Sequence, residues 1–293
     1  RSLCEFLFNK GIFFKTVTRG SIQHQFHHGS NISCDFSKPF NLEPELKDCR
    51  CLVHLASCVH NKIDFSEEYY RIVNIEATRM LAEQASAAKM QRFIFFSSAA
   101  VFGQESLFKK PFSVDSDCLP ATYYGKSKLK AEAEIKNICN ESNLSYSIIR
   151  PPMVYGKDAP GNWNRILKFL SYGPPVPLGA INNLRSFLFI GNLLSFVETI
   201  INSDKAVDKT FLVTDDKDIS TTQLVNEIKG HEEYHFLNFR INHALLNLVF
   251  KLPGLSNVSS QLTKNMQLDI SYTKSQLNWE PPFNIKESIR KSI

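Results

Sequence analysis

The sequence has no glycine-rich phosphate-binding loop. Neither G-x-G-x-x-G nor G-x-x-G-x-x-G occurs in its 293 residues. Such a loop joins the first strand and first helix of a dinucleotide-binding βαβ unit. The chain opens at Arg1 inside an amphipathic pattern that predicts a helix, followed by Gly11 and the strand pattern IFFKTVT, residues 12–18. We therefore expect either that the strand and turn that open such a unit lie before Arg1, or that the chain binds no dinucleotide.

Other absences exclude whole classes of function. The seven cysteines are irregularly spaced and form no C-x-x-C pair, which predicts reduced thiols in a cytoplasmic protein. No apolar run reaches the roughly 20 residues that span a bilayer, and no signal peptide is visible, so we expect no membrane partner. The net charge of +5 is spread along the chain without a block of like charge, which argues against a nucleic-acid partner.

Two histidine-rich segments invite a metal interpretation, but the sequence predicts no metal site. The segment HQFHH, residues 24–28, contains no carboxylate partner. The segment HEEYH, residues 231–235, matches the zinc pattern H-E-x-x-H, which requires both histidines on one face of a helix. Gly230 precedes it directly, and the residues after it alternate like a strand.

Three residues with complementary proton-transfer chemistry stand out. Tyr124 and Lys128 are four residues apart at the start of a helical pattern, so both side chains lie on one helix face. A phenol has a pKa of about 10, and a nearby ammonium group favours its ionised form. Ser98 ends an apolar run and can hydrogen-bond the same substrate oxygen. Serine, tyrosine and lysine together predict acid–base catalysis on a hydroxyl or carbonyl group.

The segments around these residues carry a family resemblance. FFSSAAVFG, residues 95–103, and YYGKSKLKAE, residues 123–132, resemble the extended short-chain dehydrogenase/reductase family, especially its nucleotide-sugar epimerases and reductases. The resemblance implies an α/β fold with a doubly wound parallel Rossmann-type sheet and a smaller C-terminal substrate domain. It also implies that the N-terminal strand and glycine-rich turn of the fold are missing from this chain.

The resemblance implies a division into two domains. We expect a dinucleotide-binding domain of residues 1–157 and 185–214, and a nucleotide-sugar-binding domain of residues 158–184 and 215–293. The ligands would lie between them, at the carboxyl ends of the strands. The long helices that begin near Glu67 and Tyr123 would form the interface of a homodimer.

The resemblance also assigns residues to an NAD or NADP cofactor, with NAD slightly favoured. Arg19 follows the first predicted strand, where it is either a solvated loop residue or a contact for the 2′-phosphate of NADP. Small residues after the strand CRCLVHLAS, residues 49–57, would let the backbone approach the cofactor. The implied cofactor set is Arg19, Asp35, Leu55, Ala56, Ser57, Asn74, Ser97, Tyr124, Lys128 and Pro151.

A nucleoside-diphosphate sugar is the implied substrate. Arg185 matches the position of a diphosphate-binding arginine, because a guanidinium pairs strongly with phosphate. The proline-rich loop GPPVPLG, residues 173–179, would pack against the base. The implied substrate set is Val59, His60, Ser98, Asn162, Leu178 and Arg185.

The residues directly after the catalytic hydroxyl narrow the expected reaction. Ala99 and Ala100 stand where dehydratases of the family have Asp-Glu, which argues against elimination of water. A 4-epimerase acting on a UDP-hexose is favoured. Arg19, the Val59-His60 pair and Met153, which replaces a common asparagine, favour the alternative of an NAD(P)H-dependent 4-keto-sugar-nucleotide reductase. A non-catalytic nucleotide-sensing protein is a third alternative.

Overall fold

The chain folds into two compact units. A computed structural model describes residues 1–20, 31–59, 66–157, 159, 162–242, 245–246, 259 and 262–293. The first unit comprises Arg1–Val101, Pro120–Arg150 and Val197–Thr210. The second unit comprises Phe102–Leu119, Pro151–Phe196 and Phe211–Ile293.

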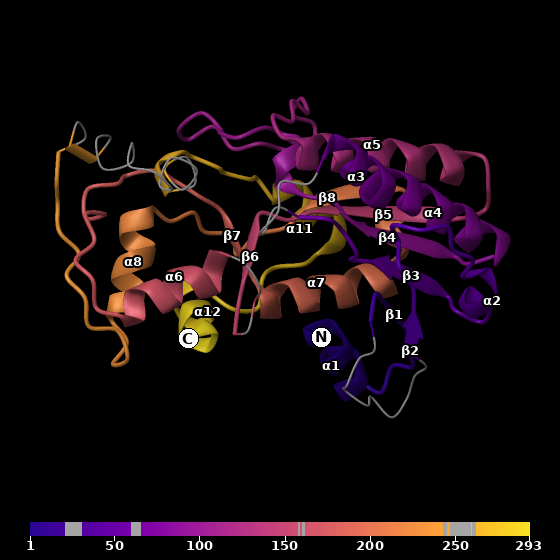
Figure 1. Cartoon of the computed structure of the whole chain (residues 1–293), viewed down its shortest axis with the longest axis horizontal. Helices are drawn as coiled ribbons and strands as arrows, with labels where there is room; N and C mark the ends of the chain where they lie inside the picture. Colours follow the sequence, from indigo (N-terminus) through magenta and orange to yellow (C-terminus); the bar gives the residue numbers. More distant parts are fainter. Residues whose placement is uncertain are drawn as a thin grey trace. The chain divides into compact units, whose positions relative to one another are not determined.

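Parallel strands form the centre of the first unit (Figure 1). β1 (Thr16–Thr18) pairs with β2 (Asn31–Ser33), also in parallel. A second sheet has the order β3-β4-β5-β8, in which β8 crosses the boundary between the units. Its strands are β3 (Cys51–His54), β4 (Arg92–Phe96), β5 (Ser145–Arg150) and β8 (Lys209–Leu212). All five residues of β4 are buried, as expected for a parallel strand covered on both faces.

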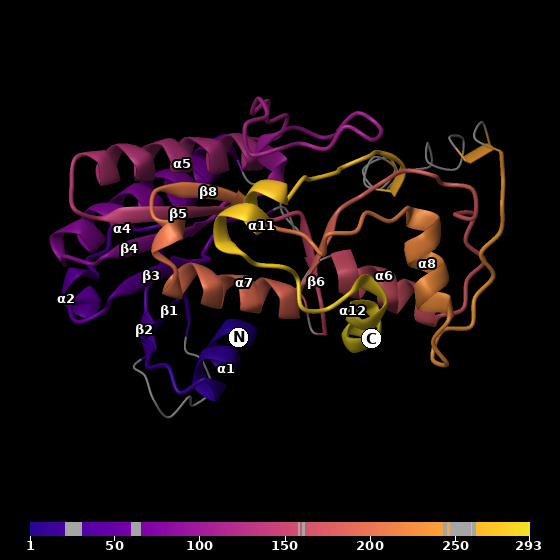
Figure 2. The same ribbon diagram turned by 180° about the vertical axis from the view of Figure 1, so that it is seen from behind.

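Helices cover both faces of this sheet (Figures 1 and 2). On one face, α4 (Ala77–Ala87) and α5 (Tyr123–Asn140) bury apolar side chains against β4 and β5. On the other face, the end of α7 (Ile190–Asn202) is held by buried Arg92 of β4, whose Nη1 donates to the carbonyl of Ile200 at 2.6 Å. The expected doubly wound α/β architecture is therefore confirmed.

Shorter helical segments complete the first unit. A π-helical stretch, η1 (Arg71–Glu76), joins α3 (Glu67–Tyr70) to α4, so the long helix predicted from Glu67 is locally widened. The remaining segments are α1 (Ser2–Asn9), α2 (Glu43–Leu46), the 3₁₀ turn η2 (Ala99–Val101) and the 3₁₀ turn η3 (Asp204–Ala206).

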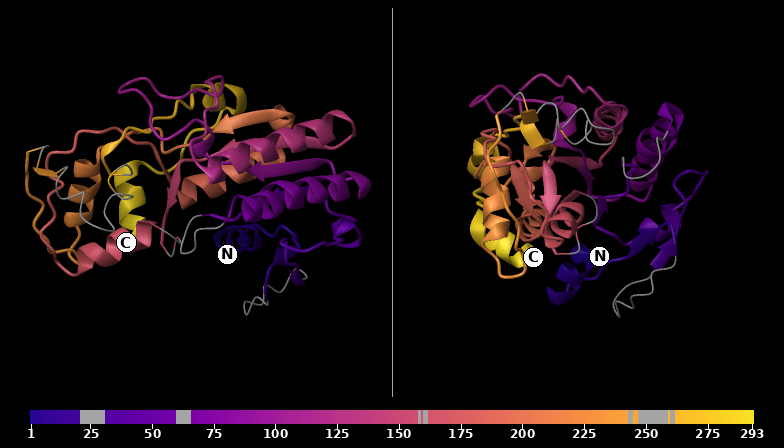
Figure 3. Two further views of the ribbon diagram at one scale, coloured as in Figure 1. Left: turned by 45° about the horizontal axis from the view of Figure 1, so that its top comes forward. Right: turned by 60° about the vertical axis from the view of Figure 1, so that its left-hand side comes forward.

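The second unit is built around a two-stranded parallel sheet of β6 (Met153–Tyr155) and β7 (Phe187–Phe189) (Figure 3). Its described helices are α6 (Asn162–Ser171), α8 (Thr221–Lys229), α11 (Ser271–Leu277) and α12 (Ile285–Ser292). Aromatic rings fill its core, with Tyr155 lying 5.0 Å from Trp163 between ring centroids. A capping box between Ser220 and Gln223 starts α8.

The structure differs from the sequence pattern in one strand and from the predicted domains at several boundaries. The apolar pattern LSYSIIRPPMVYG, residues 144–156, predicts one strand, but β5 and β6 belong to separate sheets. Pro151 and Pro152 lie between them and lack the N–H groups that continue a ladder. The second unit contains four segments that the sequence-based division places in the first domain: residues 102–119, 151–157, 185–196 and 211–214. There the N–H of Phe112 donates to the carbonyl of Gln267 at 2.8 Å.

The HEEYH segment does not place its histidines on one helix. α8 ends at Lys229, Gly230 is its C-cap residue, and the N–H of Tyr234 closes a turn on the carbonyl of His231 at 3.0 Å. The HQFHH segment lies outside the described residues. No helix in the described part of the chain is long and apolar enough to cross a membrane.

Candidate active site

Ser98 is held at the carboxyl end of β4, the central strand of the first unit. Its Oγ accepts a hydrogen bond from the N–H of Ala100 at 3.2 Å. Its carbonyl accepts another from the N–H of Val101, also at 3.2 Å. The hydroxyl therefore sits on a short, internally bonded turn rather than on a free loop.

The first turn of α5 lies directly against this Ser98 turn. Thr122 is the N-cap residue, and its side chain accepts from the N–H of Gly125 at 3.0 Å. A Cβ atom added to Gly125 would lie 2.5 Å from the carbonyl oxygen of Ala100. Only glycine permits this approach of two backbones, which places Tyr124 beside Ser98.

The Tyr124 phenol is hydrogen-bonded to Ser98, and its pKa is shifted in the direction opposite to the one that the sequence predicted. Burial raises the pKa of the Tyr124 phenol, while a hydrogen bond to Ser98 lowers it in part. The sequence predicted a net lowering through Lys128. Burial outweighs the stabilisation of the phenolate because a charged group loses its hydration when it leaves water.

Lys128 is one of the most deeply placed charged groups of the first unit. Its side chain is fully buried, and Nζ donates to the carbonyl of Phe96 at 2.7 Å. The same nitrogen lies 4.6 Å from the ring centroid of Phe95, a cation–π contact. Burial lowers the pKa of Lys128 to about 7, and the charge of Glu132 opposes that shift.

Asn74, in the π-helical stretch η1, joins the segment after β3 to the first turns of α5. Its Oδ1 accepts from the N–H of Cys58 at 2.7 Å, and its Nδ2 donates to the Oγ of Ser127 at 2.9 Å. Ser127 in turn donates to the carbonyl of Tyr124 at 2.8 Å. This buried chain fixes the loop after β3 relative to the first turn of α5.

Several predicted cofactor residues follow the carboxyl ends of strands in the first unit, the edge where parallel α/β sheets bind ligands. Arg19 comes after β1 and Asp35 after β2, and hydrogen bonds from Ser37 lower the pKa of Asp35, with a smaller contribution from the charge of Arg19. Leu55, Ala56 and Ser57 come directly after β3. Pro151 is buried in the second unit, directly after β5.

One orphaned polar atom tests whether these residues fit a dinucleotide. Among the described residues, the buried Oγ of Ser97 has no hydrogen-bond partner. A buried hydroxyl without a partner costs free energy unless a ligand supplies one. Its place after β4, beside Ser98, fits a cofactor with ribose or amide groups.

The predicted substrate residues are distributed over both units, and part of the set is described. Val59 is 44% exposed in the segment after β3. His60 and the side chain of Asn162 lie outside the described residues, although Asn162 is the first residue of α6. The carbonyl of Leu178, in the second unit, accepts from the Oγ1 of Thr222 at 2.6 Å.

Arg185 is half-buried in the second unit and remains a cation at neutral pH. The N–H of Arg185 donates to the carbonyl of Ile219, and the N–H of Ile219 donates to the carbonyl of Arg185, both at 3.1 Å. The Nη1 of Arg185 donates to the carbonyl of Lys264 at 2.9 Å. Burial lowers the pKa of Arg185 to about 10, with Glu105 acting in the opposite direction. A fixed guanidinium of this kind suits an anionic ligand group.

Three residues of the site were missed from the sequence. Gly125, Ser127 and Glu132 all belong to α5, between or just beyond the expected pair. A signal existed for Glu132, because it follows Lys128 by four residues and so faces it one turn later. No local pattern reveals that Gly125 touches the Ser98 turn, since that contact is tertiary.

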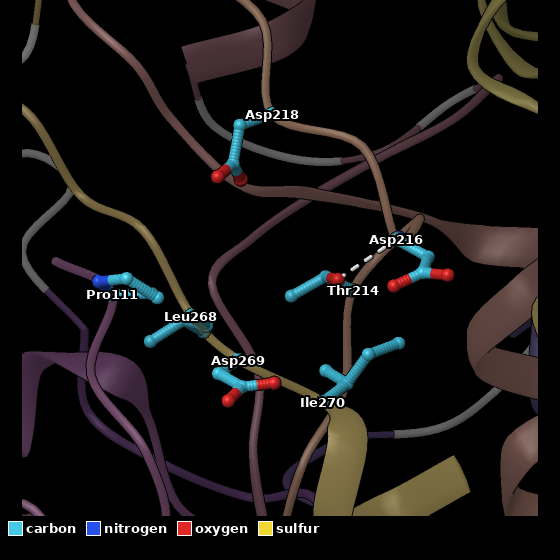
Figure 4. A pocket seen from close by; sticks show the side chains of 7 residues that line it. All are labelled: Pro111, Thr214, Asp216, Asp218, Leu268, Asp269 and Ile270. Atoms are coloured by element: carbon cyan, nitrogen blue, oxygen red, sulfur yellow. Dashed lines mark hydrogen bonds between the residues drawn. The ribbon is translucent and has the colours of Figure 1, made fainter. Parts of the chain in front are cut away.

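The second unit also contains a cavity of about 180 Å³ with three carboxylates on its wall (Figure 4). Asp218 accepts from the side chain of Gln267 at 2.7 Å, and Asp216 pairs with Lys274 at 2.7 Å. Asp269 accepts from the N–H of Ser271 at 2.8 Å. These carboxylates are used internally, and no group of three metal-ligating side chains occurs in the described residues.

Comparisons with known proteins agree with this arrangement. The model of the NAD dependent epimerase/dehydratase family matches residues 1–213. The chain is 35% identical over 266 residues to a UDP-glucose 4-epimerase of Vibrio cholerae, covering 89% of this chain and 79% of that protein. The chain therefore belongs to the NAD dependent epimerase/dehydratase family. This confirms the resemblance and the expectation of an NAD(P)-dependent enzyme of the extended short-chain dehydrogenase/reductase type.

Solved structures support the fold at much lower identity. A UDP-glucuronic acid 4-epimerase from Bacillus cereus in complex with NAD has a TM-score of 0.79 at 18% identity, covering 99% of this chain and 92% of that one. MoeE5 in complex with UDP-glucuronic acid and NAD has a TM-score of 0.78 at 19% identity, covering 99% and 93%.

Proposed function

We propose that the protein is a nucleotide-sugar 4-epimerase that acts on a UDP-hexose with tightly bound NAD. The observation that carries the proposal is the meeting of Ser98, Tyr124 and Lys128 at the carboxyl end of β4. Relatives support the substrate class, because the Vibrio cholerae protein is named a UDP-glucose 4-epimerase.

Each residue of the set has a distinct role in this proposal. Bound NAD would supply a hydride acceptor and donor. Tyr124 would remove the proton from the sugar hydroxyl at carbon 4 and return a proton to the same oxygen after the configuration at carbon 4 is inverted. Ser98 hydrogen-bonds the same oxygen and the phenol. Lys128, one helical turn after Tyr124, would stabilise the phenolate that forms when Tyr124 loses its proton.

The remaining predicted residues are proposed as binding groups. Ser97, Asn74 and the Leu55–Ser57 segment would approach the cofactor, with Arg19 and Asp35 at the adenosine end. Arg185 would pair with the diphosphate of the substrate, and Val59, His60, Asn162 and Leu178 would contact the sugar nucleotide. We also propose a homodimer formed by the helices that begin at Glu67 and Tyr123, which light scattering at the elution peak of a sizing column would test.

A 4-keto-sugar-nucleotide reductase is the second candidate, and Arg19 favours it. Arg19 is an exposed cation at the end of β1, near enough to Cys58 to lower the pKa of that thiol against the effect of burial. A guanidinium there suits the 2′-phosphate of NADP, which serves reductive reactions. Arg19→Asp would weaken NADP far more than NAD if this contact exists, and a titration with both cofactors measures it.

Cofactor requirement separates the two candidates. A 4-epimerase retains its cofactor through each cycle, so the purified full-length protein should interconvert UDP-glucose or UDP-N-acetylglucosamine and the 4-epimer without added NAD. A reductase consumes one NAD(P)H for each 4-keto sugar. Absence of the 4-epimer together with NAD(P)H oxidation by a 4-keto sugar nucleotide would refute the epimerase proposal.

A further inference from the structure

A third ionisable side chain follows Tyr124 and Lys128 along α5, one helical turn beyond Lys128. Glu132 of α5 is 1% exposed, and both of its oxygens accept hydrogen bonds from Arg150 of β5. The distances are 2.9 Å from Nε to Oε1 and 2.6 Å from Nη2 to Oε2. This two-point pairing is the strongest geometry that a carboxylate and a guanidinium adopt.

A buried ion pair between a helix and a strand has a large desolvation cost. Removing two charges from water costs several kcal/mol per ion, and apolar side chains of similar volume often serve stability as well. Ala131 and Ile135 of the same helix already pack into the apolar core beside β4 and β5. Apolar packing already joins α5 to β5, so we expect a further role of the Glu132–Arg150 ion pair in its effect on neighbouring groups.

Lys128 lies one helical turn from Glu132, and a nearby negative charge favours the ammonium form of its buried side chain. From β4 it meets the ring of Phe95 and the carbonyl of Phe96, which are neutral groups. From β3 it meets His54, whose Nε2 is bonded to Thr78 at 2.9 Å. Burial and the charge of Lys128 lower the pKa of His54 to about 3, so this ring is neutral at physiological pH.

The helix α5 supplies the other titratable groups around Lys128. Tyr124 lies one turn before it, and burial raises the pKa of that phenol, so the resting phenol is neutral at physiological pH. Glu132 lies one turn after it and favours its charged form. Among the described residues, Glu132 therefore provides the negative charge that acts on Lys128 at neutral pH.

We propose that Glu132, anchored by Arg150, is a positioning residue that keeps the buried Lys128 side chain in its ammonium form. Arg150 holds the Glu132 carboxylate in one orientation through its two hydrogen bonds. An ionised Lys128 then stabilises the phenolate of Tyr124. The link to catalysis rests on the proposed function, whereas the effect on Lys128 is a property of the folded chain alone.

The test is a direct titration of Lys128 in the full-length protein. Protein labelled with [ε-¹³C]lysine gives one NMR resonance per lysine side chain, and Lys128→Met identifies the relevant one. In Glu132→Gln the pKa of Lys128 should fall by about one unit or more, because burial then acts unopposed. Glu83→Gln is the matched control, since Glu83 also pairs with an arginine, Arg79, but on an exposed face of α4.

A second variant keeps the proposal falsifiable if Glu132→Gln does not fold. Glu132→Gln leaves Arg150 buried without its counter-charge, whereas the double variant Glu132→Met/Arg150→Met removes both charges and keeps apolar packing. The pKa of Lys128 should fall in this variant too, by less than in Glu132→Gln because the Arg150 cation is removed together with the carboxylate. An unchanged pKa of Lys128 in whichever of the two variants folds would overturn the proposal.

Activity measurements then separate this proposal from the proposed function. If the parent protein forms the 4-epimer, the pH at which kcat/KM reaches half its maximum should move in Glu132→Gln but not in Glu83→Gln. If no epimer forms but the Lys128 titration shifts, the function assigned to the site is wrong and the role of Glu132 stands. If epimer forms and the titration does not shift, the reverse holds.

Discussion

Each unit buries a carboxylate, and the two carboxylates have different kinds of partner. Glu132 of the first unit faces a cation, Arg150, at 2.6 and 2.9 Å. Asp215 of the second unit accepts from three neutral donors: the N–H of Phe189 at 2.8 Å, the Nδ2 of Asn192 at 2.7 Å and the hydroxyl of Tyr155 at 2.8 Å.

The two kinds of partner correspond to two roles. The proposed role of Glu132 is to act on Lys128 through its charge, whereas Asp215 holds neighbouring elements together through hydrogen bonds. Neutral donors do not compensate fully for burial, which raises the pKa of Asp215 to about 6. Its three hydrogen bonds tie β6, β7 and α7 together within the second unit. Glu132 instead belongs to a row of ionisable groups along α5 that ends at Tyr124. The same side-chain chemistry therefore serves different ends in the two units.

The largest expected effect is the difference in activity between Tyr124→Phe in the first unit and Tyr155→Phe in the second. Tyr124→Phe removes the transferable proton, so kcat should fall by about 10³-fold while substrate binding is nearly retained. Tyr155→Phe is the matched change in the second unit: it deletes a hydroxyl that bonds Asp215, and should cost about 1–3 kcal/mol of unfolding free energy with activity largely kept. Steady-state kinetics and urea titrations on both variants check this contrast. Activity of Tyr124→Phe within tenfold of the parent would remove Tyr124 from the mechanism.

The pH dependence of stability is the next largest effect. The pKa of Asp215 is raised from 3.8 to about 6 by burial, so the folded state binds a proton that the unfolded state has lost. The unfolding free energy should therefore decrease as the pH rises from about 4 to about 6, by up to about 3 kcal/mol. Asp215→Asn should remove this fall, as measured by urea unfolding across that range. A fall of the same size in Asp215→Asn would assign it to other groups.

Two tightly packed glycines give a smaller contrast. An added Cβ at Gly125 meets the backbone oxygen of Ala100, whereas one at Gly156 meets the Cγ2 of Ile190 at 2.4 Å. Gly125 lies in the helical turn that carries Tyr124, so Gly125→Ala should displace Tyr124 and lower kcat by roughly 10- to 100-fold. Gly156→Ala should mainly lower the midpoint of thermal unfolding. Equal kcat values for the two variants would show that the approach of α5 to the Ser98 turn is not needed for catalysis.

Local patterns in the sequence were enough for much of the first unit. The four-residue spacing of Tyr124 and Lys128 at the start of a helical pattern predicted both side chains on one face, and both residues lie in the first turns of α5. The buried strand ending at Ser97 and Ser98 was also visible, because parallel strands covered on both faces are continuous apolar runs.

The remaining features depend on contacts between distant segments. The sign of the pKa shift at Tyr124 results from burial, which no local pattern reports. The pairing of Glu132 with Arg150 joins residues from two elements, and so does the approach of Gly125 to Ala100. Spacing along the chain therefore predicted the candidate reacting groups, whereas the contacts that set their pKa values are seen only in the folded structure.

The most direct test of the account traces the hydrogen at carbon 4 of the sugar. A UDP-hexose carrying deuterium at that carbon is incubated with the full-length protein without added cofactor, and both 4-epimers are isolated. The account predicts that the product 4-epimer retains the deuterium at carbon 4, because hydride leaves and returns within one site and Tyr124 moves only the hydroxyl proton. A 4-epimer that has exchanged its deuterium for solvent hydrogen, or no epimer at all, would contradict it.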